Sequence, residues 1–148
     1  MSKAEVLEKI KNAKNAHNAN MKKALLLSEG IPLEGDPVPV GFRECAFGKW
    51  LYGDEAQVRR ALGEAQYSEI ETLHKAWHDE YNKIYDVYYK DGKKGFLGKL
   101  FGGRPKLSEL EREKAKNYCG DLKEITWSLT KKMEAIEKRV ERMPSDCC

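Results

Sequence analysis

Three long stretches of the chain carry apolar residues at every third or fourth position, and this spacing decides the fold class. The stripe within residues 2–28 consists of Val6, Ile10, Ala13, His17, Met21 and Ala24. The stripe within residues 66–90 consists of Tyr67, Ile70, His74, Trp77, Tyr81, Ile84 and Tyr88. The stripe within residues 107–142 consists of Tyr118, Leu122, Ile125, Leu129, Met133, Ile136 and Val140. Each stretch therefore predicts an amphipathic helix that must bury one face.

Local signals place the ends of these helices and predict a shorter one between them. Gly30 and Pro32 end the first long helix. A shorter helix is expected from Cys45 to about Leu62. A capping box is predicted at the start of the last helix, because a glutamate follows Ser108 by three residues. Three long helices and a shorter one, with few strand signals, predict an all-α four-helix bundle with a metal site between helices.

The length, net charge and apolar content of the chain limit the class of protein it can be and the partners it can bind. Its 148 residues are enough for one domain, expected over 1–148, and the net charge of +3 is too small to indicate nucleic acid. No run of 18 apolar residues is present, so no membrane-spanning helix is expected. The charged start, Met1–Glu5, has no apolar segment of a secretory signal. We therefore expect a cytoplasmic protein whose four cysteines are thiols or metal ligands.

Two segments do not follow the helical pattern. Residues 91–106 contain several glycines, which predict a flexible loop. Within that segment, basic and apolar residues alternate over 93–104, so contact with an anionic membrane or a partner protein is the alternative, which we do not favour. Residues 144–148 are expected to form a frayed tail that carries Cys147 and Cys148.

Four nitrogen and sulfur donors stand out along the sequence. His74 and His78 are four residues apart, so their imidazoles share one face of a helix and can hold one metal ion. His17 lies in the stripe of the first helix, and Cys45 begins the short helix. Side chains on facing helices build the metal sites of such bundles, and four protein donors complete a closed structural zinc site.

The segment around the cysteine resembles a known family. Residues 45–53 read Cys-Ala-Phe-Gly-Lys-Trp-Leu-Tyr-Gly, which is similar to the central motif of chemoreceptor zinc-binding domains. In that family a histidine precedes the cysteine and an HxxxH pair follows it, in the order of His17, Cys45, His74 and His78 here. The resemblance covers about residues 5–89.

The resemblance implies a fold, a cofactor and a role. Domains of this family are four-helix bundles that bind one zinc ion through three histidines and one cysteine, which implies that His17, Cys45, His74 and His78 are the ligands. They occur with bacterial chemoreceptors and diguanylate cyclases, or alone. They are associated with sensing zinc or oxidants such as hypochlorous acid, and they commonly form homodimers. A stand-alone member would relay its signal to a partner protein in chemotaxis or related signal transduction.

The chemistry of the four donors favours regulation over catalysis. Four protein ligands leave no open position on zinc for a substrate, so we do not expect an enzyme. Coordination keeps the Cys45 thiol deprotonated, and the thiolate is the form that oxidants attack. The first alternative function is a protein-interaction domain in which zinc has only a structural role. The second is a metal-dependent enzyme such as a di-iron bundle, which requires a Glu-x-x-His motif on each of two helices, whereas the chain has this spacing once, at Glu71 and His74.

Several neighbouring residues receive supporting roles. Gly48 is expected to permit a close approach of the short helix, although a flexible turn is an equal alternative. Glu44, Glu71 and Asp79 are the candidates to accept hydrogen bonds from the imidazole N–H groups that do not face the metal. Trp127 is expected to add to the packing of the last helix. We also expect a homodimer, because of the family resemblance and because the last helix has a long apolar stripe.

Overall fold

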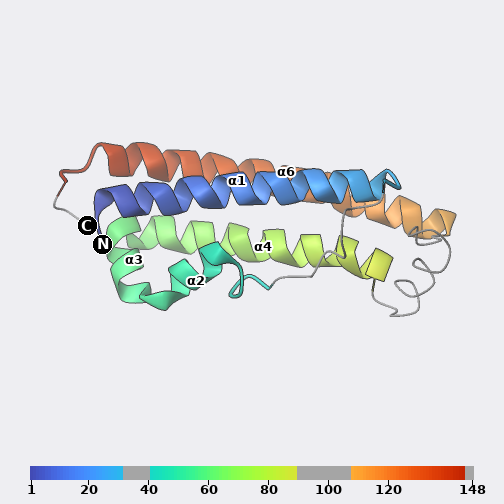
Figure 1. Ribbon diagram of the computed structural model, residues 1–148, viewed down its shortest axis with the longest axis horizontal. Helices are drawn as coiled ribbons and strands as arrows, with labels where there is room; N and C mark the ends of the chain where they lie inside the picture. The colour runs from blue at the N-terminus through green and yellow to red at the C-terminus, as the bar shows by residue number, and fades with distance from the viewer. Residues whose placement is uncertain (32–40, 90–107, 146–148) are drawn as a thin grey trace.

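The chain folds into an elongated bundle of antiparallel helices, which we describe from a computed structural model (Figure 1). The structure describes residues 1–31, 41–89 and 108–145. Its helices are α1 (Lys3–Ser28), α2 (Ala46–Gly53), α3 (Glu55–Leu62), α4 (Glu64–Tyr89) and α6 (Glu109–Glu141). The predicted all-α bundle is confirmed. The segment 91–106, including 93–104, and the end of the tail with Cys147 and Cys148 lie outside the described residues.

Helix α6 packs against both other long helices and holds them together. It runs antiparallel to α1 and to α4, which point in the same direction (Figure 1). At one end of the bundle the Lys3 ammonium donates a hydrogen bond of 3.0 Å to the carbonyl oxygen of Met143, so the beginning of α1 is fastened to the turn after α6. Within the described parts of the chain, no helix is both long and apolar enough to cross a membrane.

The expected short helix is two helices, and this corrects the prediction of a single one. Asp54 separates them because it follows the last residue of α2 and its carboxylate accepts a hydrogen bond of 3.1 Å from the amide of Gln57 in α3. An aspartate that caps a helix start in this way favours a break in the preceding helix. Gly63 then ends α3 with a positive φ of 86° and leads directly into α4. The pair α2–α3 occupies the fourth position of the bundle beside one half of α4 (Figure 1).

The long helices begin where their caps predict. Ser2 caps α1 with a complete capping box to Glu5, and Ser108 caps α6 by accepting a hydrogen bond of 3.1 Å from the amide of Glu111. These caps satisfy amide groups that have no partner inside the helix. Both starts lie within about two residues of the predicted ones, because capping is decided by neighbouring residues.

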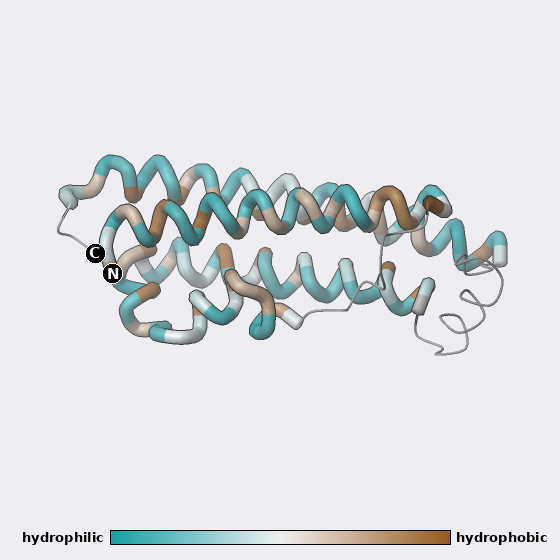
Figure 2. The backbone as a smooth tube through the Cα atoms, in the orientation of Figure 1, coloured by the Kyte–Doolittle hydropathy of each residue, from teal (hydrophilic) through white to brown (hydrophobic). Residues whose placement is uncertain are grey.

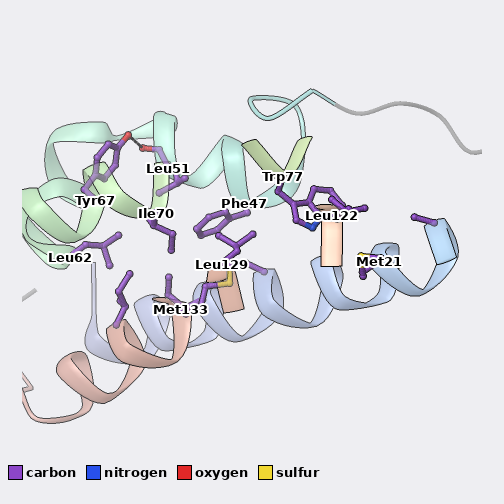
Figure 3. Packing of buried hydrophobic residues seen from close by; sticks show 14 of the residues in the cluster. Met21, Phe47, Leu51, Leu62, Tyr67, Ile70, Trp77, Leu122, Leu129 and Met133 are labelled. Carbon is purple, nitrogen blue, oxygen red and sulfur yellow. Dashed lines mark hydrogen bonds between the residues drawn. The ribbon is translucent and has the colours of Figure 1, made fainter. Parts of the chain in front are cut away.

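The core is continuous from one end of the bundle to the other. Short apolar segments recur along each long helix between hydrophilic ones (Figure 2). Apolar side chains of the long helices and of α2 and α3 meet between the helices (Figure 3). The largest fully buried ones are Trp77, Tyr67, Ile10, Leu51, Leu62, Ile70, Ile84, Leu122, Leu129, Met133 and Ile136. The stripe of α6 is thus used inside its own bundle. Trp127 is 65% exposed, so its predicted role in core packing is wrong.

A buried hydrogen bond joins α4 to α6 at the centre of this core. The indole nitrogen of Trp77 donates a bond of 2.8 Å to the hydroxyl oxygen of Thr126. The same hydroxyl donates a bond of 2.6 Å to the carbonyl oxygen of Leu122 one turn earlier. Both polar groups of this pair are therefore satisfied without water, which a buried indole N–H requires.

We predict that Thr126→Val destabilises the protein by about 1–3 kcal/mol, because it leaves the Trp77 indole N–H buried and unpaired at nearly constant side-chain volume. Urea unfolding followed by circular dichroism measures this loss. Thr72→Val is the matched control, since the Thr72 hydroxyl bonds only to the carbonyl of Ser68 on an exposed turn. Equal losses for the two variants would contradict a special role of the Trp77–Thr126 bond.

Candidate metal centre

Three separate elements bring the four predicted ligands to one place inside the bundle. His17 comes from α1, Cys45 is the residue that caps α2, and His74 and His78 come from consecutive turns of α4. One ligand atom from each of the four lies within 4.8 Å of the other three. The three imidazoles are buried and Cys45 is half-buried. The structure therefore gathers all four residues that the sequence singled out.

The distances between donor atoms suit a tetrahedral zinc ion. The Nε2 atoms of His74 and His78 are 3.1 Å apart, and the Cys45 sulfur is 3.3 Å from His74 Nε2. Zinc bonds of about 2.0–2.1 Å to nitrogen and about 2.3 Å to sulfur would separate two nitrogens by about 3.3 Å, and nitrogen from sulfur by about 3.6 Å. The cluster is thus near the size that one zinc ion requires, and its three nitrogens and one sulfur are ligands that zinc accepts.

The backbone of α1 orients the first ligand. His17 Nδ1 lies 2.7 Å from the carbonyl oxygen of Ala13 and donates its proton there, which directs the Nε2 lone pair toward the other donors. The sequence analysis predicted that Glu44, Glu71 or Asp79 accepts this hydrogen bond, and for His17 that prediction is wrong. An i−4 carbonyl is within reach of an imidazole on the same helix, so helical spacing was the signal that could have indicated it.

Glu71 belongs to a different network at the rim of the site. Its carboxylate accepts a hydrogen bond of 2.8 Å from the Tyr52 hydroxyl and pairs with Lys75 at 3.2 Å. The Arg43 guanidinium lies 4.2 Å from the centre of the Tyr52 ring. This network holds the end of α2 and the turn before it against α4, so it positions Cys45 indirectly.

Aromatic rings close the site toward the core. Phe47 meets the His74 ring edge-on at a centroid distance of 5.0 Å, and Trp77 meets His17 at 4.7 Å and His78 at 5.0 Å. Figure 3 shows Phe47 and Trp77 pointing into the same interior space. The rings exclude water from one side of the ligand set and restrict the orientation of the imidazoles. The sequence analysis assigned Trp77 to the stripe of its helix and did not predict its contact with two of the candidate ligands.

Gly48 determines how Cys45 is held. The Cys45 sulfur accepts a hydrogen bond of 3.2 Å from the Gly48 amide at the start of α2. A Cβ atom on Gly48 would lie 1.8 Å from the carbonyl oxygen of Phe42, so only glycine lets the preceding turn lie this close to the helix. The close approach that the sequence analysis proposed is confirmed, and its partner is the chain just before Cys45.

Burial favours the uncharged forms of His17, His74 and Cys45 in the metal-free site. Desolvation lowers the pKa of His17 to about 4, partly opposed by the Ala13 carbonyl, and it lowers the pKa of His74 to about 2 with help from the neighbouring imidazoles. Burial also raises the pKa of the Cys45 thiol, against the stabilising effect of the Gly48 and Phe47 amides. A zinc ion would therefore meet neutral rings at His17 and His74 and displace a proton from the Cys45 thiol.

One imidazole nitrogen at the site is left without a partner. His74 is 0% exposed, and among the described residues its Nδ1 atom has no hydrogen-bond partner. Its Nε2 atom, by contrast, points at Cys45 and His78. Burial of three imidazoles without a cation costs free energy that binding a metal ion would offset.

Comparison with known proteins identifies one family. The family model of the chemoreceptor zinc-binding domain matches residues 8–85, just over half of the chain. The matched segment contains all four clustered residues and ends within α4, so α6 lies beyond it. Searches of curated proteins and of solved structures found no match.

We predict that Gly48→Ala destabilises the protein by about 1–3 kcal/mol and weakens zinc binding, because the new methyl group pushes the Phe42 carbonyl and Cys45 aside. Thermal unfolding and competition with a chromogenic chelator measure the two effects. Gly53→Ala in the same helix is the control, since a Cβ there meets nothing within 4 Å. A Gly48→Ala protein that matched this control would show that the close approach does not matter.

We also predict that metal-free protein loses stability as the pH falls from 6.5 toward about 4. In this range unfolded histidines take up protons at the ordinary pKa of 6.5, whereas folded His17 and His74 resist protonation. The unfolded state then binds more protons, so the free energy of unfolding decreases, by an amount on the order of 3 kcal/mol for His17. Above pH 6.5 these groups contribute no slope. Urea titrations of wild type and His17→Gln across this range measure the difference, and parallel curves would contradict it.

Proposed function

Because the chain belongs to the chemoreceptor zinc-binding domain family, we propose that it is a zinc-dependent sensory domain that holds one ion through His17, Cys45, His74 and His78. One observation carries this proposal: four donors from three elements converge within 4.8 Å in the interior of the bundle. The family is one of regulatory domains, and the proposed site agrees with this, since four protein ligands leave zinc no open position for a substrate.

Cys45 is the proposed point at which a signal enters. Cys45 is a half-buried residue, whereas the three histidines are buried, so we infer that it is the donor that a small oxidant reaches from solvent. Hypochlorous acid would oxidise the thiolate by two electrons to a sulfenic acid and be reduced to chloride. The product is a weaker ligand than a thiolate, so the zinc ion would be held by three bonds and released more easily.

Trp77 offers a physical route from the site to the rest of the bundle. Its ring contacts His17 and His78, and its N–H bonds to Thr126 on α6. A shift of the two imidazoles on zinc loss would therefore move the indole and change how α4 packs on α6. We infer that α6 carries the signal to a protein partner and that residues 1–148 act as one domain. A homodimer and a cytoplasmic location remain part of the same proposal.

The test is zinc content before and after oxidation. We expect about one zinc ion per chain in protein purified without added metal, because structural sites of this type bind tightly, and we expect release of that ion by stoichiometric hypochlorous acid. Atomic emission measures the bound metal, and a zinc-sensitive dye follows its release. Cys45→Asp, which keeps a metal ligand but removes the thiolate, should retain zinc and lose the oxidant response.

A variant with Cys147→Ser and Cys148→Ser is the control for thiol oxidation elsewhere in the chain. It should release zinc as wild type does. If this variant loses the response while Cys45→Asp keeps it, the sensing thiol is not at the metal and the zinc ion is only a structural staple. Zinc well below half an equivalent in all proteins would overturn the proposed site itself.

A further inference from the structure

A group of side chains joins the turn before Cys45 to α4 on the outside of the candidate metal centre. We call it the clasp, and it consists of Phe42, Arg43, Tyr52, Glu71 and Lys75. Arg43 is exposed and the other four are half-buried, whereas the three candidate histidine ligands are buried. The clasp therefore lies between the ligand set and solvent, at the side where Cys45 is placed.

Tyr52 is the centre of the clasp. Its hydroxyl donates a hydrogen bond of 2.8 Å to the Glu71 carboxylate, and the Arg43 guanidinium lies 4.2 Å from its ring centre. Glu71 is three residues before His74 in α4, and Arg43 is two residues before Cys45. Tyr52 thus links the turn that carries Cys45 to the part of α4 that carries His74, in parallel with the 3.3 Å contact between the Cys45 sulfur and His74 Nε2.

Two further contacts complete the clasp. Lys75 pairs with Glu71 at 3.2 Å, and its ammonium lies 5.3 Å from the centre of the Phe42 ring. The Phe42 ring in turn meets the Tyr52 ring at a centroid distance of 6.0 Å. Burial and the bond to Glu71 raise the pKa of the Tyr52 hydroxyl, so it stays a hydrogen-bond donor at neutral pH.

Cys45 is the candidate ligand that can move with least disruption of the bundle. The three histidines belong to α1 and α4, which pack against α6 along their length. Cys45 instead precedes α2, a helix of eight residues that packs against α1 and α3. Short peripheral elements open at lower cost than long core helices. An opening for an ion is therefore expected between Cys45 and His74, and not between two histidines.

We propose that a zinc ion enters and leaves the site between Cys45 and His74, and that the hydrogen bond from Tyr52 to Glu71 is the gate of this route. The bond involves no ligand atom, so it can be formed both with and without the ion. It has to break when Cys45 and its turn move away from α4. The proposal rests on the zinc site of the proposed function and specifies how exchange at that site is regulated.

A gate of this kind affects rates and leaves affinity unchanged. The bond stabilises the zinc-loaded and the zinc-free protein alike and is broken only in the transition state of exchange, so its removal lowers the barrier in both directions. Release and uptake then become faster by the same factor, and the dissociation constant, which is their ratio, stays the same. A residue that only supported the ligand set would act differently, because its loss would weaken binding itself.

Tyr52→Phe is the first test, because it removes the hydroxyl and keeps the ring beneath Arg43. Release and uptake should both become about fivefold faster, the factor that corresponds to the loss of one typical hydrogen bond. Release is measured with a zinc-sensitive dye at several concentrations of a competing chelator. Uptake by metal-free protein is followed by tryptophan fluorescence in stopped flow, since Trp77 contacts two of the candidate ligands.

Two substitutions of Glu71 test the acceptor of the bond. Glu71→Gln keeps an oxygen that accepts from Tyr52 and loses the charge that pairs with Lys75, so exchange should stay near the wild-type rate. Glu71→Met removes the acceptor and should speed exchange as Tyr52→Phe does. Combining Tyr52→Phe with Glu71→Met should add little, because both remove the same bond. Equally fast exchange in Glu71→Gln and Glu71→Met would assign the effect to the ion pair and overturn the gate.

Tyr67→Phe is the matched control. The Tyr67 hydroxyl donates a hydrogen bond of 3.2 Å to the carbonyl oxygen of Leu51, so it also joins α4 to α2, at the residue next to Tyr52 (Figure 3). Its ring lies under Arg59 in α3 and not under the turn that carries Cys45. This variant should lose stability and keep the wild-type exchange rates. Equal acceleration in Tyr67→Phe and Tyr52→Phe would show a general loosening of α2 and overturn the gate.

Zinc content and circular dichroism of every variant separate this proposal from the proposed function. Unchanged rates in Tyr52→Phe, or a higher dissociation constant without faster uptake, overturn the gate while one bound zinc per chain leaves the metal site intact. Wild type that binds no zinc overturns the site itself. Arg43→Met is a second variant that does not depend on the folding of Tyr52→Phe. It detaches the turn from the Tyr52 ring at an exposed position and should speed release and uptake together.

Discussion

Three imidazole rings and a thiol packed against one another in the interior are the arrangement on which the rest of this structure depends. Their burial lowers the pKa of His17 and His74 far enough to keep both rings neutral, and it raises the pKa of Cys45. Polar groups removed from water need partners, and a cation shared by four lone pairs would supply one to each donor atom that faces the cluster. The donor set is therefore costly for the fold without metal and well prepared for it.

The turn before α2 shows how closely the backbone is adapted to this cluster. The Phe42 carbonyl lies where a side chain on Gly48 would be, and the Gly48 amide in turn bonds the Cys45 sulfur. Cys45 is thus a helix cap and a metal-ligand candidate at the same time. Helix capping favours the thiolate through the amide dipoles of α2, while burial opposes it. Coordination to a metal ion would stabilise the thiolate and so outweigh the effect of burial.

Helix α6 connects the interior of the bundle with its surface. Thr126 faces inward and accepts the hydrogen bond from Trp77, and the next residue, Trp127, faces outward. A change in the packing of the candidate metal site could therefore reach the exposed Trp127 on α6 through Trp77 and Thr126. This proximity gives a physical reason why sensing and association could be coupled in the same bundle.

The sequence by itself determined the three long helices, the start of the last one at Ser108 and the four clustered residues. The periodic stripes predicted α1, α4 and α6 to within a few residues, because helix formation and capping depend on near neighbours. The spacing of His74 and His78 likewise placed both imidazoles on one face. The break at Asp54 was also a local signal, and it was missed although aspartate is a frequent helix cap.

Only the tertiary structure decided what each helix face meets. The sequence analysis expected Trp127 to add to the packing of α6, and only the structure shows that this side chain is 65% exposed. The bond from Trp77 to Thr126 is a further example. It joins two helices that are far apart in the sequence and whose approach is set by the packing of whole elements. Periodicity indicates which face must be buried, and only packing shows against what.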